Sequence, residues 1–141
     1  MRLFLDASVM LAAANSRSGG SRFIMDAAAA NGWRLLSGAY GIAEVERHLA
    51  KLGAVACADW PGIKARLQLV EDDFVIDRPS VFAARKDRPI LFTAYSHADV
   101  LLTLDLGDFV RAIGHQFYHL EIMTPEQFIR HERDRGTIAI P

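Results

Sequence analysis

Five carboxylate residues occupy positions from which they can act together. Asp6 ends a short apolar run, and Asp105 ends a later one, with Asp108 three residues beyond it. Asp87 lies near the start of the predicted helix that precedes the later run, and Glu44 lies one turn into another predicted helix. Two carboxylates about 4 Å apart repel by roughly 4 kcal/mol at an effective dielectric near 20. A converging group therefore either takes up protons or binds a cation.

The oxygen-only character of this group indicates which cation. Hard carboxylate ligands without histidine or cysteine partners favour Mg²⁺ or Mn²⁺ over zinc, and the five histidines show no ligand spacing. Such a metal polarises a phosphate and supplies a bound hydroxide, while a carboxylate takes the proton of the attacking water. The pattern thus predicts phosphoryl chemistry.

Simpler roles remain open for each acid taken singly. Asp6 could cap a helix, Asp87 could complement a helix dipole, and Asp108 could be an ordinary turn residue. Glu44 and Glu46 flank a core-facing position, so at most one of them points fully toward a site. These readings weaken together, because all of them would have to coincide at one end of one sheet.

Alternating strands and helices must position these acids. Short apolar strands separated by helices predict a parallel sheet of about five strands covered on both faces, an α/β/α sandwich in one domain spanning 1–141. In such sheets, ligands bind at the carboxyl ends of the strands. The expected strands are 2–5, 33–37, 74–76, 100–103 and 118–122, and the expected helices are 9–14, 23–30 (ended by Asn31-Gly32), 40–51, 59–70, 85–97 and one that starts at Thr124.

Composition narrows the class of protein. The chain has 141 residues, 51% of them hydrophobic, and a net charge of −1, so it is globular and is no general electrostatic match for nucleic acid. It contains neither an apolar run of the roughly 20 residues that span a bilayer nor a signal-peptide pattern at its start. Cys57 is the single cysteine, which excludes an internal disulfide and predicts a small core residue in a reducing, cytoplasmic setting.

Four sequence blocks together resemble the PIN-domain nucleases, and most of all the group that includes the bacterial VapC-type toxins. They are LFLDASVMLAAA, LLSGAYGIAEVERHL, DRPILFTAYSHADVLLTLDLGDF and LEIMTPEQFI, which cover the chain from Leu3 to about Ile129. The resemblance implies a PIN-like α/β/α fold and a metal-dependent endoribonuclease. It places the family's acids on Asp6, Glu44, Asp87, Asp105 and Asp108.

The resemblance also bears on substrate and partners. Small hydroxyl residues that line the family's site fall on Ser8 and Thr103. The family often has further acids where this chain has Ala83-Ala84-Arg85-Lys86. The basic residues Arg85, Lys86 and Arg88 are expected either to grip an RNA backbone or to form a solvated surface. RNA is the implied substrate, and a toxin role would add a cognate antitoxin. Many relatives form dimers, which favours a homodimer.

Three other readings compete. A haloacid-dehalogenase-type phosphatase needs a second aspartate two residues after the first, where this chain has Ser8. A response-regulator receiver needs an acidic pair at the first strand, whereas the acidic run 71–73 precedes the expected third strand and is interpreted as a solvated loop. A catalytically silent PIN-like module that binds RNA or a protein is the remaining alternative, against which the presence of all four matching acids argues.

Overall fold

The strands of this computed structural model form one sheet, described here over residues 1–79, 85–107, 109 and 115–140. Six strands lie in these ranges in the order β3-β2-β1-β4-β6-β5. All neighbouring strands run parallel except β5, which pairs antiparallel with β6 at the edge. Their bounds are β1 Arg2–Leu5, β2 Arg34–Gly38, β3 Gln68–Val70, β4 Val100–Leu102, β5 Gln116–Phe117 and β6 Leu120–Met123.

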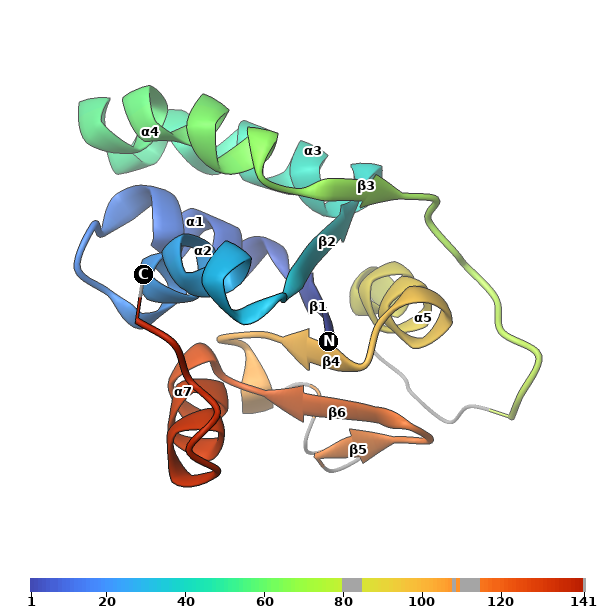
Figure 1. Ribbon diagram of the computed structural model, residues 1–141. Helices are drawn as coiled ribbons and strands as arrows, with labels where there is room; N and C mark the ends of the chain where they lie inside the picture. Colours follow the sequence, from blue (N-terminus) through green and yellow to red (C-terminus); the bar gives the residue numbers. More distant parts are fainter. Residues whose placement is uncertain (80–84, 108, 110–114, 141) are drawn as a thin grey trace.

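Helices cover both faces of the sheet (Figure 1). α1, α2 and α4 lie on one side, α5 lies on the other, and α7 packs beside α2 near the end of the chain. The helices are α1 Ala7–Asn15, α2 Gly20–Asn31, α3 Ala39–His48, α4 Ala54–Ala65, α5 Arg88–His97 and α7 Pro125–Asp134, with short 3₁₀ helices η1 Leu49–Leu52 and η2 Arg85–Asp87.

Alternation along the strands divides the core into two parts. Leu3 and Leu5 of β1 are buried with residues of α1, α2 and α4, whereas Phe4 between them is buried with residues of α5. The same two-residue period places Leu35 on the first face and Leu36 on the second. Both faces of the sheet are therefore covered, and the predicted three-layer α/β/α sandwich with a central parallel sheet is confirmed.

Two predicted helix ends are also confirmed. Gly32 follows α2 in the left-handed conformation (φ 67°), and its amide bonds back to carbonyls of the last turn. Thr124 begins α7 with a capping box, in which its hydroxyl accepts from the Gln127 amide while the Gln127 side chain accepts from the Thr124 amide.

The middle of the chain departs from the prediction. The bounds of the expected helix 59–70 are wrong, since α4 begins at Ala54, continues through Pro61 and ends at Ala65. The expected third strand 74–76 is wrong as well, because Gln68–Val70 already pairs with the outer edge of β2. Phe74 and Val75 lie outside the sheet and are 61% and 80% exposed. Both 68–70 and 74–76 contain apolar residues, so composition alone did not show that only 68–70 pairs with β2.

The burial of residues on α4 corrects one further expectation. Cys57 is exposed rather than part of the core, because the inward face of α4 consists of Ala56, Trp60 and Ile63. Trp60 is a core residue whose indole nitrogen donates a hydrogen bond of 3.2 Å to Glu46. Among the described residues, no helix has the length and apolar character that a membrane span requires.

Candidate active site at the carboxyl edge of the sheet

Asp6 occupies the junction between β1 and α1. Its backbone amide donates to the carbonyl of Leu102, which extends the ladder between β1 and β4 by one bond beyond the strand ends. Its side chain caps α1 through Oδ1, which accepts from the Ala7 amide at 2.7 Å. Asp6 is therefore both a helix cap and a carboxylate at the carboxyl edge of the sheet.

Two hydroxyl groups hold the second oxygen of this carboxylate. Oδ2 of Asp6 accepts hydrogen bonds from Ser8 Oγ at 3.0 Å and from Thr103 Oγ1 at 2.8 Å. Each hydroxyl also accepts a backbone amide, Ser8 from Leu104 and Thr103 from Asp105, both at 3.0 Å. These bonds tie the loop after β4 to the start of α1. Because each hydroxyl proton is donated to Asp6, the carboxylate is held in one orientation.

The electrostatics of Asp6 differ from those of a surface acid. Its side chain is only 5% exposed. Burial raises the pKa of Asp6 from 3.8 to about 6, against the lowering effect of the hydrogen bonds from Thr103 and Ser8, and the negative charge of Asp105 raises it further. Asp105 itself is exposed at the same edge. The site therefore combines a buried carboxylate with a like charge close enough to influence it.

Helix α3 and the start of α5 border the same edge. The Tyr40 hydroxyl donates a hydrogen bond of 2.6 Å to the carbonyl of Lys86 in η2. Gly41 of α3 lies next to α5, since a Cβ there would be in van der Waals contact, 3.4 Å, with Ile90. Glu44, half-buried, lies one turn beyond Tyr40 on α3. Asp87, also half-buried, takes the N-cap position of α5.

An acid that the sequence interpretation missed supports this arrangement. Oδ2 of Asp72 accepts the backbone amide of Tyr40 at 2.9 Å and thereby caps the first turn of α3. A Cβ at position 38 would overlap Oδ1 of Asp72, so only glycine leaves room for this contact. The backbone amide of Asp73 donates to Thr93 Oγ1 at 2.8 Å. Residues 71–73 form a loop, as expected, but Asp72 and Asp73 are half-buried in it rather than fully solvated.

The predicted site residues are thus brought together in part. Direct contacts and charge join Asp6, Ser8, Thr103 and Asp105, and the elements that carry Glu44 and Asp87 border the same edge. Lys86 is exposed and Arg88 is half-buried. Asp108 and the side chain of Arg85 lie outside the described residues.

The donor set fits a hard divalent cation. Within the described part of the chain, no three acidic, histidine or cysteine side chains gather closely enough to form a complete metal cage. Ionisation of the Asp6 carboxylate is nevertheless unfavourable, because the group is buried and the negative charge of Asp105 acts on it, and a bound cation would offset that cost. Oxygen ligands of this kind suit Mg²⁺ or Mn²⁺, with Asp6 and Asp105 as the residues to hold it.

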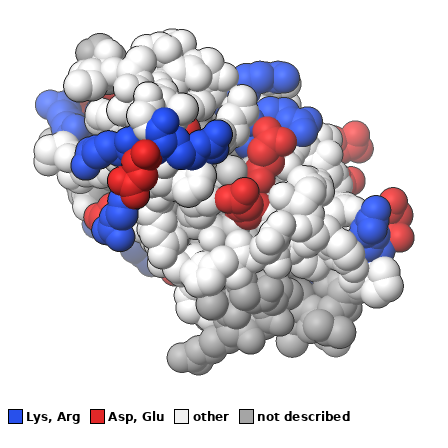
Figure 2. Space-filling view, turned by 60° about the horizontal axis from the view of Figure 1, so that its bottom comes forward, with Lys and Arg blue, Asp and Glu red and all other residues white. Residues whose placement is uncertain are grey.

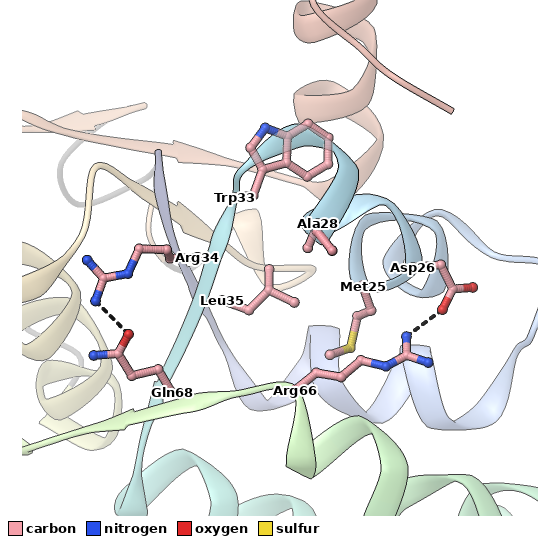
Figure 3. Close-up of a pocket in the computed structure, with 9 residues that line it drawn as sticks. Met25, Asp26, Ala28, Trp33, Arg34, Leu35, Arg66 and Gln68 are labelled. Atoms are coloured by element: carbon pink, nitrogen blue, oxygen red, sulfur yellow. Dashed lines mark hydrogen bonds and ion pairs between the residues drawn. The ribbon is translucent and has the colours of Figure 1, made fainter. Parts of the chain in front are cut away.

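A separate pocket lies at the opposite edge of the sheet (Figure 3). It has a volume of about 490 Å³ and is entered where β2 and β3 begin, whereas Asp6 follows the end of β1. Trp33 and Leu35 contribute apolar surface, and the rim carries the Arg34–Gln68 hydrogen bond and the Arg66–Asp26 ion pair. This pocket takes no part in the acidic site.

A comparison with protein families identifies the family of this chain. A family model described as PIN domain matches residues 2–107, which is most of the chain. The chain belongs to the PIN-domain family. No curated protein and no solved structure matches it. PIN domains are generally nucleases that use divalent metals, and Asp6, Glu44, Asp87 and Asp105 of this PIN domain all fall within the matched range.

Proposed function

We propose that this PIN domain is a metal-dependent endoribonuclease that hydrolyses RNA phosphodiester bonds. The observation that carries the proposal is the state of Asp6, a carboxylate buried at the carboxyl edge of a parallel sheet with its pKa raised to about 6. A protein seldom buries a carboxylate beside a second acid without a functional reason. The geometry of the two hydroxyl donors supports the same view, since they hold Asp6 ready for a ligand.

The residues take different roles in this proposal. Asp6 and Asp105 hold the cation, joined by Asp87 and Asp108, and Glu44 accepts the proton of the attacking water. The bound Mg²⁺ or Mn²⁺ would polarise the scissile phosphate and activate a water molecule. Ser8 and Thr103 orient Asp6 through their hydroxyl groups.

The basic residues beside Asp87 complete the proposal. Arg85, Lys86 and Arg88 supply cations for the substrate backbone next to η2. The bond from Tyr40 to the Lys86 carbonyl supports this placement, because it fixes η2 against α3. Phosphate contacts of this kind position a nucleic acid without reading its sequence.

A cleavage assay with a matched pair of variants tests the activity. Wild-type protein should cleave RNA in Mg²⁺ or Mn²⁺ and lose this activity in EDTA, and Asp6→Asn should lower the rate on the order of 10²-fold or more. Asp26→Asn is the control, because Asp26 is an exposed α2 acid paired with Arg66 away from the site. Equal rates for wild type and Asp6→Asn would reject the nuclease proposal and favour a silent binding module.

A role as the toxin of a toxin–antitoxin pair is a narrower form of this proposal. It is supported by the resemblance of the four sequence blocks to VapC-type proteins. A neighbouring short reading frame should then encode a DNA-binding protein that co-purifies with this chain and inhibits its cleavage of RNA. Light scattering of the purified chain tests the expected homodimer.

A further inference from the structure

Basic side chains continue from the acidic site along α3 and η1. Arg47 and His48 follow Glu44 at spacings of three and four residues, which places them on the same side of α3 as Glu44, and Lys51 follows in the last turn of the 3₁₀ helix η1. The three basic residues are exposed, whereas Glu44 is half-buried. We call Arg47, His48 and Lys51 the basic stripe.

Arg47 and Lys51 differ in their ion pairing from other basic residues in the described part of the chain. Within the described residues, no carboxylate oxygen lies within 4.0 Å of a side-chain nitrogen of Arg47 or Lys51, whereas Arg22, Lys64 and Arg66 each have such a partner. These two side chains can therefore exchange solvent ions for phosphates without breaking an ion pair.

The acid nearest to the stripe in sequence is turned away from it. Glu46 lies on the flank of α3 that faces α4, where it accepts from Trp60 and pairs with Lys64 at 3.2 Å. The exposed positions between this flank and the stripe are occupied by uncharged residues, Ala43 and Ala50. Positive charge is thus segregated to the side of α3 that also carries Glu44.

The position of the stripe relative to the site is fixed by the contacts of Tyr40. Its amide is held by Asp72 and its hydroxyl by the Lys86 carbonyl, which anchor the first turn of α3 at the carboxyl edge of the sheet. At about 1.5 Å per residue in α3 and about 2.0 Å per residue in η1, Lys51 lies about 12 Å along the chain axis from Glu44.

We propose that the backbone of a single-stranded RNA leaves the active site along this stripe, with its phosphates bound by Arg47 and Lys51. The inference rests on the proposed nuclease function and adds the path of the substrate. A single row of basic side chains along α3 and η1 matches one phosphate backbone, and such contacts hold the strand without reading its sequence.

A structural role for the same residues makes a different prediction. Arg47 and His48 lie in the last turn of α3, where cations stabilise the helix dipole. If that were their whole role, replacing Arg47 would lower the stability of the protein and leave RNA binding unchanged. RNA affinity and its dependence on salt therefore distinguish the two roles.

Binding of a short fluorescein-labelled single-stranded RNA tests the proposal. Fluorescence anisotropy is measured in EDTA over a range of KCl concentrations, so that no cleavage is required. Arg47→Gln combined with Lys51→Gln should weaken binding about tenfold at low salt, and should reduce the slope of log K against log salt by about 1.4, or about 0.7 for each lost phosphate contact on a single strand.

Two basic residues of α7 provide the matched control. Arg130 and Arg133 are exposed, but α7 also carries Glu126 and Asp134. On the underside of the molecule shown in Figure 2, basic and acidic side chains lie interspersed. Arg130→Gln combined with Arg133→Gln should leave both the affinity and the salt slope unchanged.

The outcomes separate this inference from the nuclease proposal. The proposed RNA path along the basic stripe is overturned if the salt slope of the Arg47/Lys51 variant is unchanged, or if the α7 control loses as much slope. Either result would stand even if the wild type cleaves RNA in Mg²⁺. A selective loss of slope supports the stripe even if cleavage is never observed, in which case only the nuclease proposal fails. Thermal melting of each variant shows whether the fold is intact.

Discussion

Thr103 Oγ1 donates a 2.8 Å hydrogen bond to Oδ2 of Asp6, although the two residues are 97 positions apart in the sequence. Thr103 Oγ1 also accepts a hydrogen bond of 3.0 Å from the backbone amide of Asp105. One hydroxyl group therefore sets the orientation of the buried acid and shapes the loop that carries the second acid. Residues that seemed suited to contacting substrate act first on the carboxylates themselves.

Replacing Thr103 by valine should damage both functions of this hydroxyl. Valine keeps the branched shape but neither donates to Asp6 nor accepts from Asp105, so we expect a loss of about 2 kcal/mol in the free energy of unfolding and a lower cleavage rate. Urea denaturation and an RNA cleavage assay measure the two effects. Thr103→Ser retains the hydroxyl and should stay close to wild type. Full stability in Thr103→Val would show that the bond contributes little.

The raised pKa of Asp6 predicts how stability depends on pH. Because the folded state binds the Asp6 proton more tightly than the unfolded state, this residue favours folding below about pH 4, and the contribution is lost as pH rises through about 6. A shift from 3.8 to about 6 corresponds to about 3 kcal/mol. The difference in unfolding free energy between wild type and Asp6→Asn, measured in EDTA from pH 4 to pH 8, should change in this direction. A constant difference would contradict the raised pKa.

Divalent cations should stabilise the folded protein at pH values at which Asp6 is ionised. Mg²⁺ or Mn²⁺ binds the folded site and so raises the melting temperature by mass action. The effect should be larger at pH 8 than at pH 5, since protons compete for Asp6 at the lower pH. Melting with and without the ions is the measurement, and Asp6→Asn is expected to lose the effect. An equal response from Asp6→Asn would place the cation elsewhere.

Gly38 and Asp72 should behave as one unit. A Cβ at position 38 overlaps Oδ1 of Asp72, so Gly38→Ala displaces the carboxylate from the Tyr40 amide. Gly38 has an extended backbone (φ −110°) that alanine also adopts, which leaves the lost cap as the main cost, about 1 kcal/mol. Asp72→Ala should cost about the same.

The double-mutant cycle tests this coupling. Gly38→Ala combined with Asp72→Ala should be no less stable than either single variant, because the overlap and the cap disappear together. Additive losses in urea denaturation would mean that the two residues act independently.

The sequence predicted most of the fold because its periodic segments are strong. Asp6 and Asp105 follow apolar strands that are buried on both faces, and this pattern is visible without any tertiary information. β3 was missed because it is a three-residue edge strand with Leu69 60% exposed, so burial leaves little trace in its composition.

That error also concealed part of the candidate site. With β3 at Gln68–Val70, Asp72 follows its strand much as Asp6 follows β1, and its role at the carboxyl edge becomes understandable. The hydrogen bonds that Ser8 and Thr103 donate to Asp6 could not be predicted, because they depend on the register of β1 against β4.

The bond from the Thr103 amide to the Met123 carbonyl has a consequence for how the chain can be shortened. Asp6, Glu44, Asp87 and Asp105 all lie within the matched range 2–107, whereas Met123 ends β6 beyond it. A fragment cut after residue 107 would keep these four acids but lose the strand that flanks β4, leaving β4 as an open sheet edge. The range that holds the four candidate acids and the minimal folding unit of this protein therefore have different boundaries.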